Sequence, residues 1–335
     1  MGAAIRRPIA GTAGWKGSDF RSKDDVAFDL GPRHLAAFDA AIVEARRQGL
    51  GIPAIGKSHH DFPTIADDIA ALKRELMQGR GMVILRGWPV EKYSLDEIGL
   101  LYGWLGSHFG KPVIQSGKGD RLGYVADVPQ PGKINRGYRS NAELRMHTDS
   151  DDIVGLLCMR KAQTGGLSRI VSAITVYNEI LATKPHLLDP LFEGFRIHWN
   201  GEEAPGEPPV TAYRVPVFSE TQGLLSICFG YKYIEDAFAA LGLEPNALEK
   251  EALAYLDETA SRDDLVYEFQ LEPGECSFIN NYTTLHSRTS FEDWPDENRR
   301  RLLLRLWLQA HEPRPIHANL RRYYGVDGMH AEQVA

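Results

Sequence analysis

The 335-residue chain has the composition of a globular protein, with 43% hydrophobic and 25% charged residues, which is enough apolar material for a full core and excludes general disorder. Its net charge is −7, and its Lys and Arg residues are scattered apart from a run at 299–301, so the basic stripe of a nucleic-acid-binding protein is absent. No uninterrupted apolar stretch reaches membrane-spanning length. We therefore expect neither nucleic acid nor a membrane as a partner.

Three cysteines, Cys158, Cys228 and Cys276, lie far apart and form no C-x-x-C motif. An odd number of isolated cysteines indicates free thiols in a reducing compartment, and it argues against a disulfide framework or a thiolate zinc site. The N-terminus carries an Arg pair but no apolar segment follows it, so we predict no signal peptide. These features predict a cytoplasmic protein.

The N-terminal third is predicted to be helical after an initial arm. Residues 1–30 are Gly-rich and lack any hydrophobic period, which indicates a flexible arm. Apolar residues recur at helical spacing over 33–48 and 64–78, so both stretches are predicted to be helices.

From residue 81 the pattern becomes mixed. The continuous apolar run at 81–87 predicts a buried strand, and 94–110 predicts a helix that starts with a Ser94–Glu97 capping box. After Pro112, short strand-like runs separated by turn-rich segments follow one another. They are "PVIQS", "LGYVADV", "IVGLLCM", "SRIVS", "FRIHW", "AYRVPVF", "LLSICFG", "LVYEFQL", "CSFIN" and "RLLLRLWL".

Helical insertions at 173–192 and 245–260 interrupt this series of strands. The succession predicts a mainly β fold with helical insertions, in which a two-sheet antiparallel barrel or jelly roll is flanked by the N-terminal helices. We expect a single domain over residues 31–320 and a C-terminal tail over 321–335.

The stretch "LRMHTDSDD" offers two metal ligands, His147 and Asp149, at the entry to a strand. Strand alternation would place Arg145, His147 and Asp149 on one side of the backbone. The spacing alone is not informative, because it recurs at His59 with Asp61 and at His330 with Glu332.

A metal site needs a third ligand, and the candidate is His286 in "NNYTTLHSRTSFED". Two His and one carboxylate on one face of an octahedron can hold Fe(II) and leave the opposite face open for substrates. Zinc is the competing metal, although hydrolytic zinc sites usually need a further acid or base, and no motif supplies one here.

Two arginines share one face of the predicted strand near the C-terminus. Arg301 and Arg305 alternate with leucines, so both guanidinium groups would point inward. Inward arginines are costly unless an anion meets them, and a planar guanidinium suits a carboxylate. The alternative is an exposed edge strand whose charges prevent aggregation.

With these residues assembled, the sequence resembles the Fe(II)- and 2-oxoglutarate-dependent dioxygenases of the taurine dioxygenase (TauD/TfdA-like) family, within the clavaminate synthase-like superfamily. The resemblance extends from about residue 81 to residue 308, and its signature is the ordered set "HTD", "GGLSRIVS", "NNYTTLHSRTSFED" and "RRRLLLRLWL". It implies a double-stranded β-helix core. It also implies an enzyme that uses O2 to couple oxidative decarboxylation of 2-oxoglutarate to succinate with hydroxylation of a small polar or carboxylate-bearing metabolite.

The resemblance also assigns roles to residues. It implies that His147, Asp149 and His286 bind iron, that Arg301 and Ser168 hold the distal carboxylate of 2-oxoglutarate, and that Arg305 contacts an anionic substrate or the cosubstrate. Because Asp149 keeps its carboxylate, the position that a halogenase opens to halide is filled. Hydroxylation is the expected reaction, with desaturation or ring formation as alternatives.

Other residues have no firm counterpart in the family. Arg145 could bind an acidic part of the substrate, and Asn141 and Gln115 could lie at the edge of the pocket, although each could equally be an ordinary loop or strand residue. Asn280 and Asn281 could orient His286 or simply shape a turn, and Trp307 is expected in the core.

Two other functions stay open at this stage. One is a catalytically silent barrel that acts as a binding module, and the other is a zinc hydrolase that uses the same three ligands. The expected partner is a small-molecule substrate, with a homo-oligomer as a further possibility.

Overall fold

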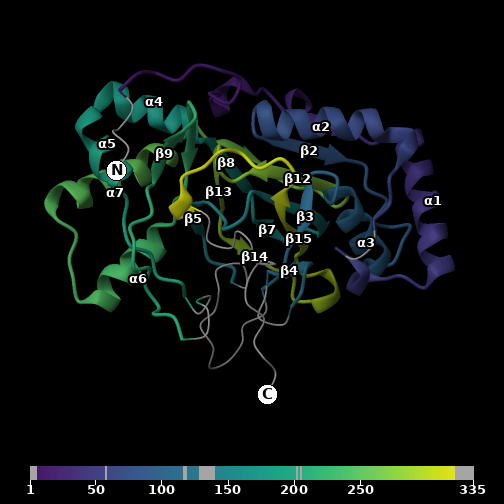
Figure 1. Cartoon of the computed structure of the whole chain (residues 1–335). Coiled ribbons are helices and arrows are strands. Elements are labelled where there is room, and N and C mark those ends of the chain that lie inside the picture. Colours follow the sequence, from purple (N-terminus) through teal and green to yellow (C-terminus); the bar gives the residue numbers. More distant parts are fainter. Residues whose placement is uncertain are drawn as a thin grey trace.

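The computed structural model describes residues 6–56, 59–115, 119–127, 140–200, 203 and 206–320. Two β-sheets lie at the centre of the molecule, and helices cover their outer sides (Figure 1). The strands of the larger sheet are β1 (Ala27–Asp29), β2 (Met82–Arg86), β3 (Gly110–Pro112), β4 (Gly123–Val125), β6 (Ile153–Arg160), β12 (Glu275–Asn280) and β15 (Leu302–Ala310). The strands of the smaller sheet are β5 (Leu144–His147), β8 (Ser168–Ser172), β11 (Tyr267–Phe269) and β13 (Thr284–Arg288).

The larger sheet has the order β1-β2-β12-β6-β15-β3, with β4 also bonded to β15, and the smaller sheet has the order β11-β8-β13-β5. Neighbouring strands pair antiparallel except β1 and β2, which run parallel. Two short pairs lie outside these sheets: β9 (Phe218–Thr221) with β10 (Leu224–Ile227), and β7 (Thr164–Gly165) with β14 (Phe291–Glu292).

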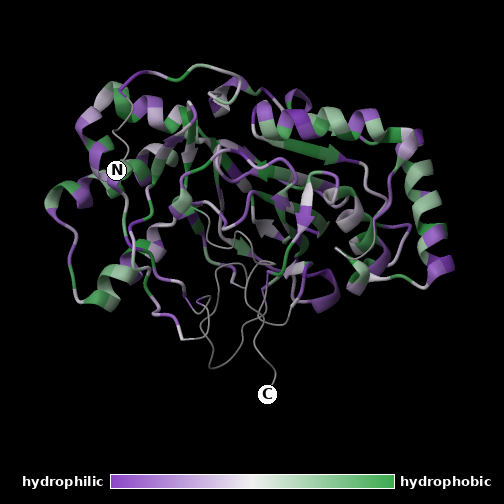
Figure 2. Ribbon diagram, viewed as in Figure 1, coloured by the Kyte–Doolittle hydropathy of each residue, from purple (hydrophilic) through white to green (hydrophobic). Residues whose placement is uncertain are grey.

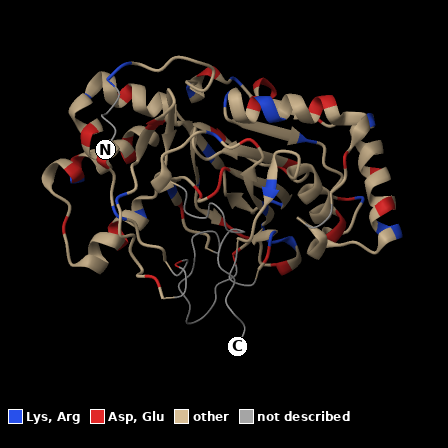
Figure 3. Ribbon diagram, viewed as in Figure 1, with Lys and Arg blue, Asp and Glu red and all other residues tan. Residues whose placement is uncertain are grey.

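The helices form two groups that cover opposite flanks (Figure 1). The first group is α1 (Pro32–Gln48), α2 (Ala66–Gln78) and α3 (Leu95–Gly106). The second is α4 (Ala173–Thr183), α5 (Leu188–Glu193), α6 (Tyr231–Leu241) and α7 (Ala247–Ala260). Charged residues lie mostly on these helices and on connecting segments, whereas the central strands carry few (Figure 3).

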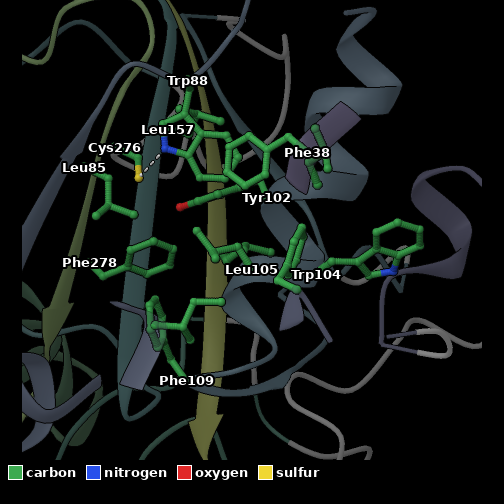
Figure 4. Packing of buried hydrophobic residues seen from close by; sticks show 14 of the residues in the cluster. Phe38, Leu85, Trp88, Tyr102, Trp104, Leu105, Phe109, Leu157, Cys276 and Phe278 are labelled. Carbon is green, nitrogen blue, oxygen red and sulfur yellow. Dashed lines mark hydrogen bonds between the residues drawn. The ribbon is translucent and has the colours of Figure 1, made fainter. Parts of the chain in front are cut away.

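The first group of helices packs on the outer face of the larger sheet through a core rich in aromatic residues (Figure 4). Trp88 stacks on Phe38 of α1 at 5.0 Å between ring centroids, and Phe278 of β12 meets Phe109 edge-on at 5.0 Å. Each helix turns its apolar side to this core, so green and purple segments alternate along α1 and α2 (Figure 2).

A second core lies between the two sheets and holds the residues that will matter for function. On β15, Leu304, Leu306 and Leu308 enter the helical core, whereas Leu303 and Trp307 enter the core between the sheets. Arg305 lies between the latter two in sequence, so alternation directs it to the space between the sheets. The structure therefore confirms the predicted alternation of side chains along this strand.

The segment that precedes α1 is packed, which corrects the prediction of a flexible arm over residues 1–30 for its described part. Trp15 is buried and its indole N–H donates to the carbonyl of Arg80 at 2.9 Å. Gly17 lies so close to another segment that a Cβ there would stand 1.9 Å from the carbonyl oxygen of Val266. The Gly-rich composition serves close backbone packing here, and composition alone cannot separate that use from looseness.

Two further predictions of local structure differ from the fold. The runs "FRIHW" and "AYRVPVF" form no strand before β9 begins at Phe218. Phe195 makes an isolated bridge with Val215, and His198 makes one with Val210, which precedes the second run. Helix α6 was not predicted, although its apolar residues follow a helical spacing. The predicted helix over 173–192 is split into α4 and α5, because Pro185 interrupts the helical hydrogen bonds.

At the level of fold class, the prediction of a sheet-rich fold with N-terminal and inserted helices is confirmed. The described strands do not close either sheet into a barrel. None of the described helices combines the length and the apolar character that crossing a bilayer would require.

Candidate metal centre

His147, Asp149 and His286 come together on the side of the smaller sheet that faces the larger one. His147 ends β5 and lies directly opposite His286 of β13 in the antiparallel register. Their ring centroids are 4.3 Å apart, and the Nε2 atom of each ring lies 3.9 Å from a carboxylate oxygen of Asp149. One donor atom from each residue falls within 4.8 Å of the others, so the three can share one cation.

Both imidazoles present Nε2 to the centre of this group. The Nδ1 atom of His147 lies 2.8 Å from the carbonyl oxygen of Arg145, so Nδ1–H donates there and leaves the lone pair on Nε2. Burial and the neighbouring His147 lower the pKa of His286 to about 3. His286 is therefore neutral at physiological pH, as a metal-binding imidazole must be.

Asp149 is fixed by one residue of β15 and by one residue of the turn after β12. The indole N–H of Trp307 on β15 donates to Oδ2 of Asp149 at 2.8 Å, and the backbone N–H of Asp149 donates to Oδ1 of Asn281 at 3.3 Å. Burial alone would raise the pKa of Asp149, but His286, Arg305 and the other neighbours outweigh it and hold this pKa below its usual value. The carboxylate is therefore ionised and pointed at the two imidazoles.

This donor set fits a divalent transition metal. Two neutral nitrogens and one carboxylate oxygen on one side of a site match the arrangement that holds Fe(II) in oxygenases, and zinc accepts the same ligand types. Nδ1 of His286 is buried and has no hydrogen-bond partner among the described residues, so this ring is held by packing and not by a second hydrogen bond.

Arg301 lies against Gly166, two positions before Ser168. Arg301 is 5% exposed, and its Nη1 is buried without a hydrogen-bond partner among the described residues. A Cβ on Gly166, whose φ is +71°, would stand 3.3 Å from Nε of Arg301, so the "GG" of the sequence motif leaves room for the guanidinium. Ser168 opens β8, which pairs with β13, the strand of His286.

Arg305 is held by Gln115 through reciprocal contacts. Nε of Arg305 donates to Oε1 of Gln115 at 2.8 Å, and Nε2 of Gln115 donates to the carbonyl of Arg305 at 2.9 Å. The guanidinium stacks on Trp307, 4.4 Å from the ring centroid, and its charge lowers the pKa of Asp149. Gln115, predicted as a residue of the pocket edge, is thus a positioning partner of Arg305.

Arg145 does not follow the alternation from which its role was predicted. The register between β5 and β13 shifts between His147 and Leu144, so one extra residue of β5 bulges. Arg145 stacks on Tyr231 of α6, 4.5 Å from the ring centroid, and lies 3.7 Å from a carboxylate oxygen of Asp257 on α7. Its neighbours are therefore side chains of the second group of helices.

Of the remaining candidates, Asn141 and Asn280 make contacts that shape the fold, and Asn281 supports Asp149. Asn141 is exposed, and its carbonyl accepts the backbone N–H of Phe291 at 3.1 Å. Asn280 accepts the backbone N–H of Tyr282 and shapes the turn that leads into β13. Asn281 orients Asp149, where an effect on His286 was expected, and it also donates to the carbonyl of Asp151 at 2.7 Å.

Sequence reasoning placed Trp307 in the core and missed its bond to Asp149. Trp307 does belong to the core between the sheets, but its indole N–H reaches the carboxylate. The available signal was its position two residues after Arg305 on the inward face of the same strand. An indole N–H on that face lies close to the candidate ligands.

Comparison with known proteins decides the family. The protein family described as "Taurine catabolism dioxygenase TauD, TfdA family" matches residues 47–307 of this chain. The chain belongs to this family. The resemblance noted from the motifs is thereby confirmed, and with it the prediction of an oxygenase that uses Fe(II), 2-oxoglutarate and O2. Membership of the TauD/TfdA family favours this enzyme over the zinc hydrolase and over the silent binding module.

Similar proteins cover nearly the whole chain. FR-33289 synthase of Streptomyces rubellomurinus (strain ATCC 31215) is 31% identical over 323 residues, which are 94% of this chain and 94% of that protein. L-asparagine oxygenase of Streptomyces coelicolor (strain ATCC BAA-471 / A3(2) / M145) is 25% identical over 299 residues, 82% of each chain.

Solved structures of TauD/TfdA-like oxygenases share the fold. Asparagine oxygenase in complex with Fe(II), 3-hydroxyasparagine and succinate superposes with a TM-score of 0.65 at 19% identity, over 85% of this chain and 93% of that one. The non-heme iron oxygenase OrfP with Fe, succinate and a dihydroxy-arginine also gives 0.65, at 13% identity, over 90% and 99%.

Proposed function

We propose that this TauD/TfdA-family enzyme holds Fe(II) with His147, Asp149 and His286 and hydroxylates a small, carboxylate-bearing metabolite. The observation that carries the assignment is the convergence of two imidazole Nε2 atoms and one carboxylate within 4.8 Å. When bound, the iron supplies the redox chemistry by which O2 oxidises 2-oxoglutarate to succinate and CO2 and the substrate is oxidised.

The protein's own residues bind the metal and the two substrates and orient them. The two imidazoles donate neutral lone pairs, and Asp149 offsets part of the cation's charge while Trp307 holds its carboxylate in place. Arg301 and Ser168 are assigned to the distal carboxylate of 2-oxoglutarate. Arg305 faces the same space as Asp149, where it can meet an acid group of either substrate.

The class of substrate is inferred from the positive charge at the candidate site and from the similar proteins. A buried guanidinium beside the candidate metal centre favours an anionic group on the molecule bound there. The similar asparagine oxygenase and OrfP structures contain hydroxylated amino acids. We therefore assign a small amino acid or a comparably small acid as the substrate, with hydroxylation as the reaction.

The type of core, the domain boundaries and the cellular location are proposed on the same basis. Two facing antiparallel sheets and the similarity to these oxygenases support a double-stranded β-helix core in one domain over residues 31–320; the tail over 321–335 lies outside the described residues. Free cysteines at positions 158, 228 and 276 support a cytoplasmic location. The homo-oligomer stays an untested prediction.

The test uses spectroscopy and product release. Under anaerobic conditions, Fe(II) and 2-oxoglutarate together should give a visible charge-transfer band, and O2 should then release succinate. His147→Ala and Asp149→Ala should lose both signals. His59→Ala is the matched control, because His59 lies 3.2 Å from Asp61 at the surface with the same sequence spacing and should keep both.

Other outcomes would contradict the proposal. Binding of 2-oxoglutarate without succinate release in O2, across a panel of amino acids and related acids, would indicate a binding module. Zinc-dependent hydrolysis with neither the band nor succinate would indicate the hydrolase.

A further inference from the structure

A second buried arginine, Arg288, lies beside the residues assigned to 2-oxoglutarate. It follows His286 by two positions on β13, so both side chains lie on one face of the strand, about 7 Å apart along it. In the pairing of β13 with β8, Arg288 stands opposite Ser168 and His286 stands opposite Ile170. Ile170 belongs to the core between the sheets, so this face is the one that looks toward β15.

Arg288 and Arg301 are both buried and both lack an acidic partner within ion-pair distance among the described residues. Arg288 is 6% exposed and Arg301 is 5% exposed. The Nη1 atom of each is buried without a hydrogen-bond partner in the described part of the chain. The other nitrogens of Arg288 donate to backbone carbonyls, those of Thr289 at 3.2 Å and of Ala142.

The two guanidinium groups gather around one phenyl ring. The Cζ atoms of Arg288 and Arg301 lie 4.7 and 5.1 Å from the ring centroid of Phe291. Burial, followed by the charge of Arg288, lowers the pKa of Arg301 to about 10. Two like charges buried together with unsatisfied donors are costly, and a bound anion would relieve both costs at once.

Nearby carboxylates do not fill this role. Oδ1 of Asp293 accepts the backbone N–H groups of Arg301 at 2.7 Å and of Trp294 at 3.0 Å. Its Oδ2 is buried without a hydrogen-bond partner among the described residues, and it makes no ion pair with Arg288 or Arg301 within 4.0 Å. The charge of Asp127 acts on Arg288, but the two make no ion pair within 4.0 Å.

We propose that Arg288 is a second cation of the cosubstrate site, which binds the distal carboxylate of 2-oxoglutarate from β13 while Arg301 binds it from the position that precedes β15. This inference rests on the proposed function. Arg288 lies two positions along β13 from the metal ligand His286, about 7 Å, a span that a five-carbon 2-oxo diacid can bridge. The second guanidinium favours diacids over 2-oxo acids that lack the distal carboxylate.

The test measures binding without turnover. The affinities of the Mn(II)-loaded protein for 2-oxoglutarate and for 2-oxopentanoate, which has the same chain length but no distal carboxylate, are compared by anaerobic calorimetry. Arg288→Gln should weaken 2-oxoglutarate binding by about 10- to 100-fold, the usual range for a charge-assisted hydrogen bond, and leave 2-oxopentanoate unchanged. Arg288→Lys should retain an intermediate affinity.

A matched control separates this role from a structural one. Arg314 is also a mostly buried arginine, and it donates to the carbonyl of Leu225 at 2.8 Å without an acidic partner in the part of the chain that the structure describes. Arg314→Gln should leave both affinities unchanged. The double variant Arg288→Gln/Arg301→Gln should lose less affinity than the product of the single losses, because both residues act on one carboxylate.

Three results would overturn the inference. They are unchanged 2-oxoglutarate binding in Arg288→Gln, equal weakening of both 2-oxo acids in that variant, and a folded Arg288→Lys that binds 2-oxoglutarate as weakly as Arg288→Gln. Failure of the wild-type protein to bind 2-oxoglutarate with Mn(II) would instead contradict the proposed function itself.

Discussion

At the scale of single residues, the candidate metal centre depends on one indole as much as on its ligands. Trp307 donates to the oxygen of Asp149 that lies nearer to His286, and it also carries the stacked guanidinium of Arg305. A carboxylate ligand restrained in this way keeps its orientation before metal arrives, which lowers the cost of binding. Trp307 therefore links the candidate metal ligand Asp149 to the guanidinium group of Arg305.

Trp307→Phe tests this link. Loss of the N–H should reduce Mn(II) or Fe(II) affinity by about 10- to 100-fold, as is usual when a partner of a metal ligand is removed. Titration against a competing chelator measures the change. Trp88→Phe is the control, since the indole of Trp88 donates to the sulfur of Cys276 in the helical core. Equal affinities in the two variants would refute the role of Trp307.

At the scale of elements, the structure shows which sequence patterns are informative. Alternation along β15 correctly predicted an inward Arg305, because that stretch of the strand pairs regularly with β6. The same reasoning failed for Arg145, because a bulge in β5 breaks the register and no residue type announces it. Motif order was enough to select three candidate ligands that lie together in the structure, whereas the bond from Asn281 to Asp149 depends on how a turn and a loop meet in space.

The packed N-terminal segment gives a prediction at this scale. In Gly17→Ala the new methyl group would meet the carbonyl of Val266, so we expect a loss of about 1–3 kcal/mol in the free energy of unfolding. Urea denaturation measures it. Gly51→Ala is the control, because its Cβ would meet nothing closer than 3.9 Å, and the change should stay within about 0.5 kcal/mol. Similar losses in both variants would argue against docking through Gly17.

At the scale of the whole molecule, the candidate site joins the two sheets. Its three ligands come from β5, the residues after it and β13, while Trp307 and Arg305 come from the larger sheet. Motif order in the sequence could indicate the candidate ligands but not the residues that hold Asp149 in place. The reason is that Asn281 and Trp307 lie more than 130 positions from Asp149 along the chain. A bound cation would therefore tie distant parts of the chain together.

Metal removal should show this coupling as a change in stability. At a free metal concentration 100 times the dissociation constant, binding to the folded state alone adds about 2.7 kcal/mol. We expect Mn(II) to raise the melting temperature and a chelator to reverse the shift. Asp149→Ala should melt at the same temperature with and without the ion. An unchanged wild-type melting temperature at saturating Mn(II) would contradict metal binding at this site.

The position of β15 has a consequence for biosynthesis. This strand lies inside the larger sheet between β6 and β3, although it ends only at residue 310. Until that segment has left the ribosome, β6 lacks β15, one of its two neighbours in the sheet, and the carboxylate of Asp149 lacks its indole donor. We therefore expect the larger sheet to be completed only after β15 has been synthesised, with the nascent polypeptide exposing until then an unpaired strand edge that chaperones can recognise.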